Sequence, residues 1–211
     1  MKKCDVSLFE WNSSLAMLIV FLGVDGSGKS TVINSFVNHI SNEWSEIKYV
    51  HFRPTYLLRG NANDKPVTNP HEGKSRGLIM SLLKLLLFAI EYNYAFYVHY
   101  RKPDQLVVFD RYYYDILADP KRAKVSAPNW VVKIFERLIP TPDITFYLHA
   151  SADVLYGRKQ EIARDDLENI LRNYSSMADT YNFYKISSET SIQVTLSEIL
   201  SIYKDAKSDL G

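Results

Sequence analysis

The feature that most constrains this chain is the stretch GVDGSGKST at residues 23–31. A glycine, four free positions and then Gly-Lys-Ser is the spacing at which a loop curls its backbone N–H groups around phosphate groups. Such a loop lets Lys29 reach the outer phosphates of a nucleotide as a point charge, while the hydroxyl of Ser30 ligates magnesium. The positive N-terminal end of the following helix faces the same anion. The stretch therefore predicts a nucleotide-binding site.

The residues on either side of this loop support that interpretation. The apolar run LAMLIVFL at 15–22 has the length and composition of a buried parallel strand. After the loop, apolar residues recur at helical spacing from Val32 to Ile40. The alternative is a glycine-rich turn that contains Lys-Ser by chance. Strand, loop and helix follow in the order that a phosphate-binding loop requires, so the context favours the nucleotide site.

Composition narrows the class of protein. The chain has 211 residues, most simply one domain, and we expect an N-terminal extension at 1–14 before a domain at 15–211. Its 25 basic and 24 acidic residues give a net charge of +1, so there is no electrostatic case for nucleic-acid binding. The single cysteine, Cys4, excludes an internal disulfide and fits a reducing, cytoplasmic setting.

Two apolar stretches have some likeness to membrane signals. Met1-Lys2-Lys3 and the later apolar run look faintly like a signal peptide, but acidic residues interrupt them and the run leads straight into the loop. The second stretch, 78–90 (LIMSLLKLLLFAI), contains Lys84 and is too short to span a bilayer. We expect it to be a helix buried in the core, with contact to a membrane surface as the alternative.

Strand-like and helix-like segments alternate along the rest of the chain, which predicts a parallel sheet sandwiched between helices. A long polar loop, of the kind that is either functional or disordered, is expected at 55–76. The expected strands lie at 46–52, 105–109, 144–148 and 191–195, and the expected helices at 77–102, 129–138, 151–184 and 196–204.

A second motif follows the strand predicted at 105–109, where Asp110 and Arg111 stand side by side. Ligands of open α/β sheets gather at the carboxyl ends of the strands, so this pair and the glycine-rich loop are expected to face one site. An acidic residue there holds magnesium directly or through water, and an arginine braces phosphate oxygens. The alternative is that Asp110 caps a turn and Arg111 forms a surface ion pair. Beside a phosphate-binding loop, the functional interpretation is favoured.

Three segments together resemble the thymidylate kinase family. They are GVDGSGKST, VVFDRYYYD at 107–115, and PDITFYLHA at 142–150 with Arg158-Lys159 after it. The likeness covers residues 17 to about 185. It implies an α/β fold of the P-loop NTPase type, a three-layer sandwich in which a parallel sheet has helices on both faces. It also implies a helical lid at about 151–168.

Carried over position by position, the resemblance implies ATP and Mg²⁺ as cofactors and a small-molecule phosphate acceptor as partner. Some relatives carry an arginine in the loop where this chain has Gly26, so Arg158 of the lid is expected to supply that charge, with Arg164 as second choice. A solvated helical charge is the alternative for Arg158. The expected catalytic residues are Lys29, Asp110, Arg111 and Arg158, the ATP-binding residues Gly23, Gly26, Ser27, Gly28, Lys29, Ser30 and Thr31, the metal ligands Ser30 and Asp110, and the acceptor-binding residues Asp25, Arg53, Tyr112 and Tyr113.

The acceptor side departs from the family pattern. The substrate-side Arg-Glu-Pro-Gly turn is present only as HFRP at 51–54, and Glu91-Tyr92 stands near the place of a mid-helix arginine. The family's Tyr-Gln contact to thymine is absent, and DILADPKR at 115–122 stands there. We expect an ATP- and magnesium-dependent phosphotransferase that acts on dTMP or a related small acceptor.

Three other functions stay open. One is a kinase for a sugar or a surface-polysaccharide precursor, and another is a nucleotide-binding regulatory module without transfer activity. The third is a kinase with a lipid-linked acceptor, because of the apolar stretch at 78–90. The resemblance also implies that a homodimer is possible, since the family is commonly dimeric through its helices.

Overall fold

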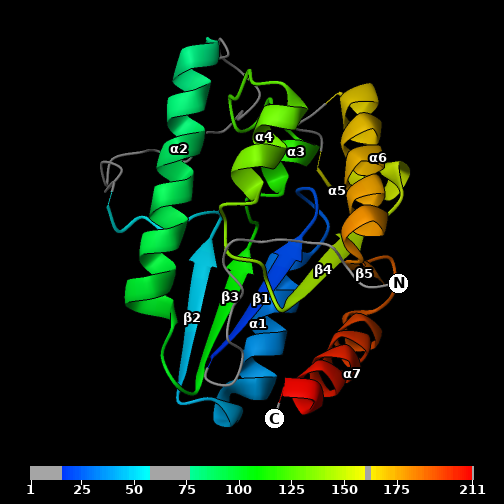
Figure 1. The fold of residues 1–211 in the computed structure, drawn as a ribbon. Helices are drawn as coiled ribbons and strands as arrows, with labels where there is room; N and C mark the ends of the chain where they lie inside the picture. The colour runs from blue at the N-terminus through cyan, green and yellow to red at the C-terminus, as the bar shows by residue number, and fades with distance from the viewer. Residues whose placement is uncertain (1–15, 58–76, 160–162, 211) are drawn as a thin grey trace.

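The computed structural model describes residues 16–57, 77–159 and 163–210, which form an α/β fold around one parallel sheet (Figure 1). The order across the sheet is β2-β3-β1-β4-β5, and every neighbouring pair is parallel. The predicted parallel sheet and its first four strands are confirmed. The strands are β1 (Ala16–Leu22), β2 (Glu46–His51), β3 (Gln105–Asp110), β4 (Ile144–His149) and β5 (Tyr184–Ser187).

The two central strands, β1 and β3, are buried along their whole length. Helices cover both faces of the sheet, so side chains of either orientation must be apolar, which explains the unbroken runs MLIVFL and LVVF. The edge strand β2 differs, because it carries Glu46 and Lys48 and is only partly buried. Charged side chains of this kind protect an exposed edge from pairing with other chains.

Helices on the two faces of the sheet form the outer layers, as the three-layer prediction requires (Figure 1). Met17, Ile19 and Phe21 of β1 point to one layer, and Leu18 and Val20 point to the other. The first layer consists of α1 (Lys29–Ile40) and α7 (Ile192–Leu210), and the second of α2 (Leu78–Ala95), α3 (Asp115–Ala118), α4 (Asn129–Glu136), α5 (Ala152–Arg158) and α6 (Arg164–Tyr181).

The strand predicted at 191–195 is wrong, since Ile192 begins helix α7. The fifth strand lies earlier, at 184–187, and begins at the last residue of the helix predicted at 151–184. Helix α6 ends at Tyr181 because Asn182 adopts a left-handed conformation, with φ of 55°, and turns the chain toward the sheet. Ile186 is then buried against β4, and this burial selects strand over helix.

Part of the predicted structure lies outside the described residues. This holds for the extension at 1–14 and for 58–76 of the long loop, while residues 55–57 of that loop carry no helix or strand. The predicted lid at 151–168 contains α5 and the start of α6, and 160–162 between them are also outside the described part.

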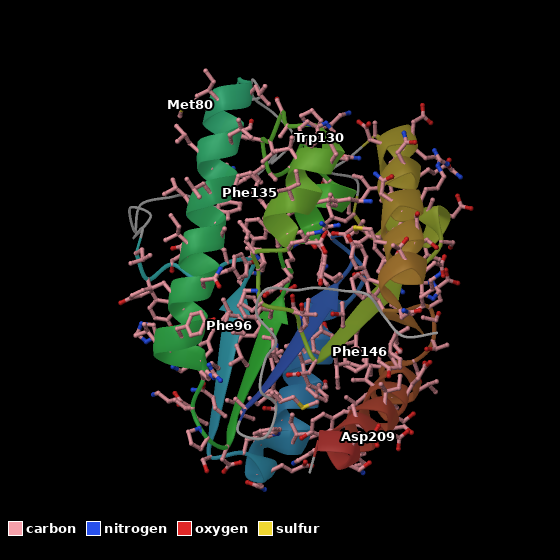
Figure 2. The ribbon with its side chains drawn as sticks, viewed as in Figure 1. Met80, Phe96, Trp130, Phe135, Phe146 and Asp209 are labelled. Carbon is pink, nitrogen blue, oxygen red and sulfur yellow. The ribbon has the colours of Figure 1, made fainter. Side chains whose placement is uncertain are left out.

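The predicted core helix at 78–90 is buried on one face only. Helix α2 continues as a π-helical turn, η2 (Phe96–Tyr100), and this span is long and apolar enough by length and composition to cross a membrane. Leu85, Phe88 and Tyr92 on its inner face pack into the core. Figure 2 shows Met80 pointing outward from α2. The exposed large apolar side chains of the span are Leu78, Ile79, Met80, Leu83, Leu86, Leu87, Ile90, Tyr94, Tyr97 and Val98.

Candidate active site

The glycine-rich loop joins the carboxyl end of β1 to the N-terminus of α1. Gly23, Gly26 and Gly28 have φ angles of 143°, 83° and 79°, in the left-handed region that other residues rarely adopt. At Gly23 a side chain is also excluded by space, because a Cβ would lie 2.5 Å from the carbonyl oxygen of Leu148. Helix α1 begins at Lys29, so its free N–H groups face the loop, which is the arrangement of an anion site.

Lys29 lies inside this loop and is almost completely buried. Its ammonium group donates to the carbonyl oxygens of Gly23 at 2.8 Å and Val24 at 2.9 Å, and contacts Ser27 Oγ at 3.5 Å. Burial, and then the positive charge of Arg111, lower the pKa of Lys29 to about 7. An anion bound in the loop would stabilise the charged form, so the lysine is poised to exchange these carbonyls for phosphate oxygens.

Asp110 ends β3 beside the loop. Its Oδ2 accepts a hydrogen bond from the Tyr49 hydroxyl at 3.0 Å and lies 3.4 Å from Nδ1 of His51, while its Oδ1 is buried and has no hydrogen-bond partner. Burial alone raises the pKa of Asp110, but the contacts with His51 and Lys29 outweigh it and hold that pKa below its ordinary value. The site therefore offers an ionised carboxylate with one unused oxygen.

These residues fit a magnesium ion. Carboxylate and hydroxyl oxygens are the ligands that Mg²⁺ accepts, and it keeps waters and substrate phosphates as its other ligands. Asp110 supplies the buried oxygen, and Ser30 lies exposed at the start of α1. No group of three or more His, Cys, Asp or Glu side chains that could hold a metal occurs in the described part of the chain.

Arg111 forms the centre of a buried ion-pair network. It has a left-handed φ of 76°, and its backbone N–H donates to the carbonyl oxygen of Phe21 at 2.9 Å. Nη1 donates to Asp115 at 2.8 Å, and Nη2 donates to Asp25 of the loop. The structure thus brings Asp25, Lys29, Asp110 and Arg111 together.

Arg122 is a residue that sequence reasoning did not place at the site. Its Nη1 donates to Oδ2 of Asp25 at 2.5 Å, so two guanidinium groups share this one carboxylate. Burial alone would raise the pKa of Asp25, but Arg111 and Arg122 hold it well below its usual range. The Arg122–Asp25 pair joins residues far apart in the sequence. The only sequence signal for it was the pair of basic residues in DPKR at 119–122.

Of the two arginines considered for the lid, only Arg158 reaches the loop. Its Nη1 donates to the carbonyl oxygen of Gly26 at 3.3 Å and its Nη2 to that of Ser188 at 3.1 Å. Arg164 instead forms ion pairs with Asp153 of α5 and Glu168 of α6 on the exposed surface. A catalytic role for Arg158 stays a prediction, and its contact with the loop is consistent with that role.

The residues expected to bind the acceptor separate into two groups. Arg53 follows β2 and donates to the buried carboxylate of Glu91 at 2.9 Å, so its charge is balanced by the residue that stands near the family's mid-helix arginine. Tyr112 and Tyr113 are buried in the core instead. Their hydroxyls donate to the carbonyl oxygens of Pro140 and Val132, so neither is directed to a ligand in this arrangement.

Comparison with known proteins bears on the identity of this site. A sequence model of the thymidylate kinase family matches residues 21–199. The chain belongs to the thymidylate kinase family. It is 28% identical over 197 residues to a probable thymidylate kinase of Methanocaldococcus jannaschii, covering 90% of this chain and 96% of that protein. This thymidylate kinase family member is accordingly a kinase, as the motifs predicted, and its family uses ATP.

Solved structures support the fold of this family member. Thymidylate kinase from Candida albicans matches with a TM-score of 0.60 at 17% identity, over 92% of this chain and 93% of that one. Deoxyadenosine kinase from M. mycoides matches with a TM-score of 0.56 at 17% identity, over 90% and 100%. Two kinases named for different acceptors share the fold, so the fold alone does not identify the acceptor of this family member.

Proposed function

We propose that this protein is an ATP- and magnesium-dependent phosphotransferase that phosphorylates dTMP or a related small acceptor. The observation that carries the proposal is the meeting of Lys29, Asp110 and Arg111 around the glycine-rich loop. One carboxylate oxygen of Asp110, Oδ1, is buried there without a hydrogen-bond partner. Phosphoryl transfer needs little covalent chemistry from the protein and depends on positioning and charge stabilisation.

Each of these residues has a role that follows from its contacts. Lys29 would leave the carbonyls of Gly23 and Val24 for the outer phosphates, and the loop N–H groups would bind the remaining oxygens. Arg111, held by Asp115, would keep its guanidinium directed at the transferred group. Ser30 and Asp110 would hold Mg²⁺, which supplies charge neutralisation between the phosphates. Arg158 would add positive charge from the lid side.

The decisive experiment is a screen for acceptor-stimulated ADP release with nucleoside monophosphates, sugars and sugar phosphates. We expect turnover with at least one acceptor, and a loss of about 100-fold or more in Lys29→Ala, because the lysine contacts the group on which negative charge develops. Lys133→Ala removes an exposed lysine of α4 and serves as the control. Full turnover in Lys29→Ala would contradict the proposal.

The screen also separates the other functions. Turnover with sugars alone would favour a kinase for a sugar or surface-polysaccharide precursor, which the balanced charge of Arg53 leaves open. Nucleotide binding in calorimetry with no acceptor-stimulated ADP release would instead favour a regulatory module.

A further inference from the structure

Two polar side chains of the edge strand β2, Tyr49 and His51, meet the carboxylate of Asp110. They are two positions apart in the strand, so their side chains lie on the same face of the sheet. In the register of the sheet, His51 stands opposite Asp110, and Asp110 stands opposite Phe21, whose ring packs in the layer of α1. All three polar side chains therefore lie on the face of the sheet that carries α1, the helix that follows the glycine-rich loop.

Tyr49 and His51 contact the same oxygen of Asp110. The Tyr49 hydroxyl donates to Oδ2 at 3.0 Å, and Nδ1 of His51 lies 3.4 Å from that oxygen. The other oxygen, Oδ1, is buried and has no hydrogen-bond partner. A carboxylate can rotate about the bond that joins it to Cβ, because this torsion has a broad energy minimum. A hydrogen bond at Oδ2 therefore fixes the direction in which Oδ1 points.

Packing and charge balance do not by themselves account for the hydrogen bond from Tyr49. Tyr49 is 51% exposed, whereas the side chain of Asp110 is only 5% exposed. A tyrosine that served packing alone would bury its ring, but here a half-exposed residue directs its hydroxyl to a buried carboxylate. The positive charges of Lys29 and Arg111 also stabilise the ionised form of Asp110. The remaining effect of the hydrogen bond is on the orientation of the carboxylate.

We propose that Tyr49, assisted by His51, is a positioning residue that holds Oδ2 of Asp110 and so keeps Oδ1 available to the magnesium ion of the bound nucleotide. This inference rests on the proposed function, which assigns Mg²⁺ to Asp110 and Ser30. Groups that hold a metal ligand in place contribute a factor of roughly 10–100 to metal affinity or activity. Tyr49 acts through Asp110 and does not itself contact the reacting atoms.

The test measures how far Mg²⁺ strengthens nucleotide binding. Calorimetry gives the affinity of the full chain for a non-hydrolysable ATP analogue in Mg²⁺ and in EDTA, and the ratio of the two dissociation constants is the coupling between metal and nucleotide. We expect Tyr49→Phe to reduce this ratio by about 10-fold while the affinity in EDTA stays at the wild-type value. Tyr184→Phe, at the start of the other edge strand β5 and 44% exposed, is the matched control and should keep the wild-type ratio.

A second set of variants tests whether Tyr49 acts through Asp110. Asp110→Asn should lower the ratio by itself, and adding Tyr49→Phe to it should lower the ratio no further, because no carboxylate is left to be positioned. Tyr49→Phe combined with His51→Ala should have a lower ratio than Tyr49→Phe alone, since His51 contacts the same oxygen. Additive effects of Asp110→Asn and Tyr49→Phe would contradict the inference.

The outcomes distinguish this inference from the proposed function. An unchanged ratio in Tyr49→Phe and in its combination with His51→Ala would overturn the inference alone. A lower melting temperature in Tyr49→Phe with an unchanged ratio would also overturn it, by showing that the hydrogen bond only stabilises the edge strand. Because no phosphate is transferred in this assay, a reduced ratio would support the inference even if the acceptor screen found no turnover. A wild type that binds the analogue equally well in Mg²⁺ and in EDTA would contradict both the metal assignment and the inference.

Discussion

Gly23 shows how strongly a single residue constrains the nucleotide site. Its backbone turns away from β1 at an angle that favours glycine, and the space where a side chain would lie is taken by the neighbouring strand β4. The loop can therefore follow its path only if this position lacks a Cβ. Lys29, which donates to the carbonyl of Gly23, depends on the same path.

We expect Gly23→Ala to destabilise the protein by about 1–3 kcal/mol and to weaken ATP binding, because the new methyl group clashes with backbone that cannot move aside cheaply. Thermal unfolding and calorimetry with ATP measure the two effects. Gly157→Ala is the matched control, since a Cβ there meets nothing within 4 Å and the residue lies in helix α5. Equal behaviour of the two variants would contradict the prediction.

Asp143, just before β4, should make stability depend on pH. Burial raises its pKa to about 7 from an ordinary value of 3.8, against the smaller opposing effect of the hydrogen bond from Leu18 N–H. Between these two values the folded state retains a proton that the unfolded chain has lost, so this group's contribution to stability falls as pH rises from about 4 to 7.

In Asp143→Asn that dependence disappears, and the amide oxygen can still accept from Leu18. Relative to wild type, the variant should gain on the order of 4 kcal/mol in free energy of unfolding between pH 4 and pH 8, because each unit of difference in pKa corresponds to about 1.4 kcal/mol. Urea unfolding at both pH values measures this, with Asp205→Asn, an exposed carboxyl on α7, as control. A difference that stays constant across pH would argue against the assignment.

Among the elements, helix α2 has two faces with different surroundings: an inner face that packs against the core and an outer face that is exposed. Its inner face carries Glu91, which pairs with Arg53, and Tyr92, whose hydroxyl donates to Phe52. Its outer face has no exposed charged side chain within the described span 78–100. Lys84 lies on the same helix but is directed inward to Ala123. Helices that lie on membrane surfaces use lysine and arginine on the adjoining face, so this outer face fits a second copy of the chain better.

We predict a homodimer in which the outer faces of α2 pack together. The substitutions Leu83→Lys and Leu87→Lys, at side chains that are 49% and 43% exposed, should together produce a monomer. Light scattering after size-exclusion chromatography measures the mass, and Val194→Lys on α7, which is 53% exposed, is the control. A wild type that stays monomeric at high concentration, or that associates with vesicles instead, would disprove the prediction.

At the scale of the whole molecule, the fold follows from patterns that are short-range in the sequence. The loop, the buried runs at β1, β3 and β4, and the Asp110-Arg111 pair could each be found locally. Because parallel strands carry their ligands at one edge, the convergence of the loop and this pair was also predictable. The fifth strand was missed because the propensity of residues 191–195 was outweighed by packing of residue 186 against β4.

From the sequence it was possible to predict a nucleotide site at residues 23–31 and to place Asp110 and Arg111 beside that loop. Only the tertiary structure decided which charges surround Asp25, that Tyr112 and Tyr113 belong to the core, and that Glu91 balances Arg53. The physical reason is that a phosphate-binding loop is a local backbone shape, written in consecutive residues. The network around Asp25 is assembled from side chains up to 97 positions apart, and their pairing depends on how distant segments of the chain pack together.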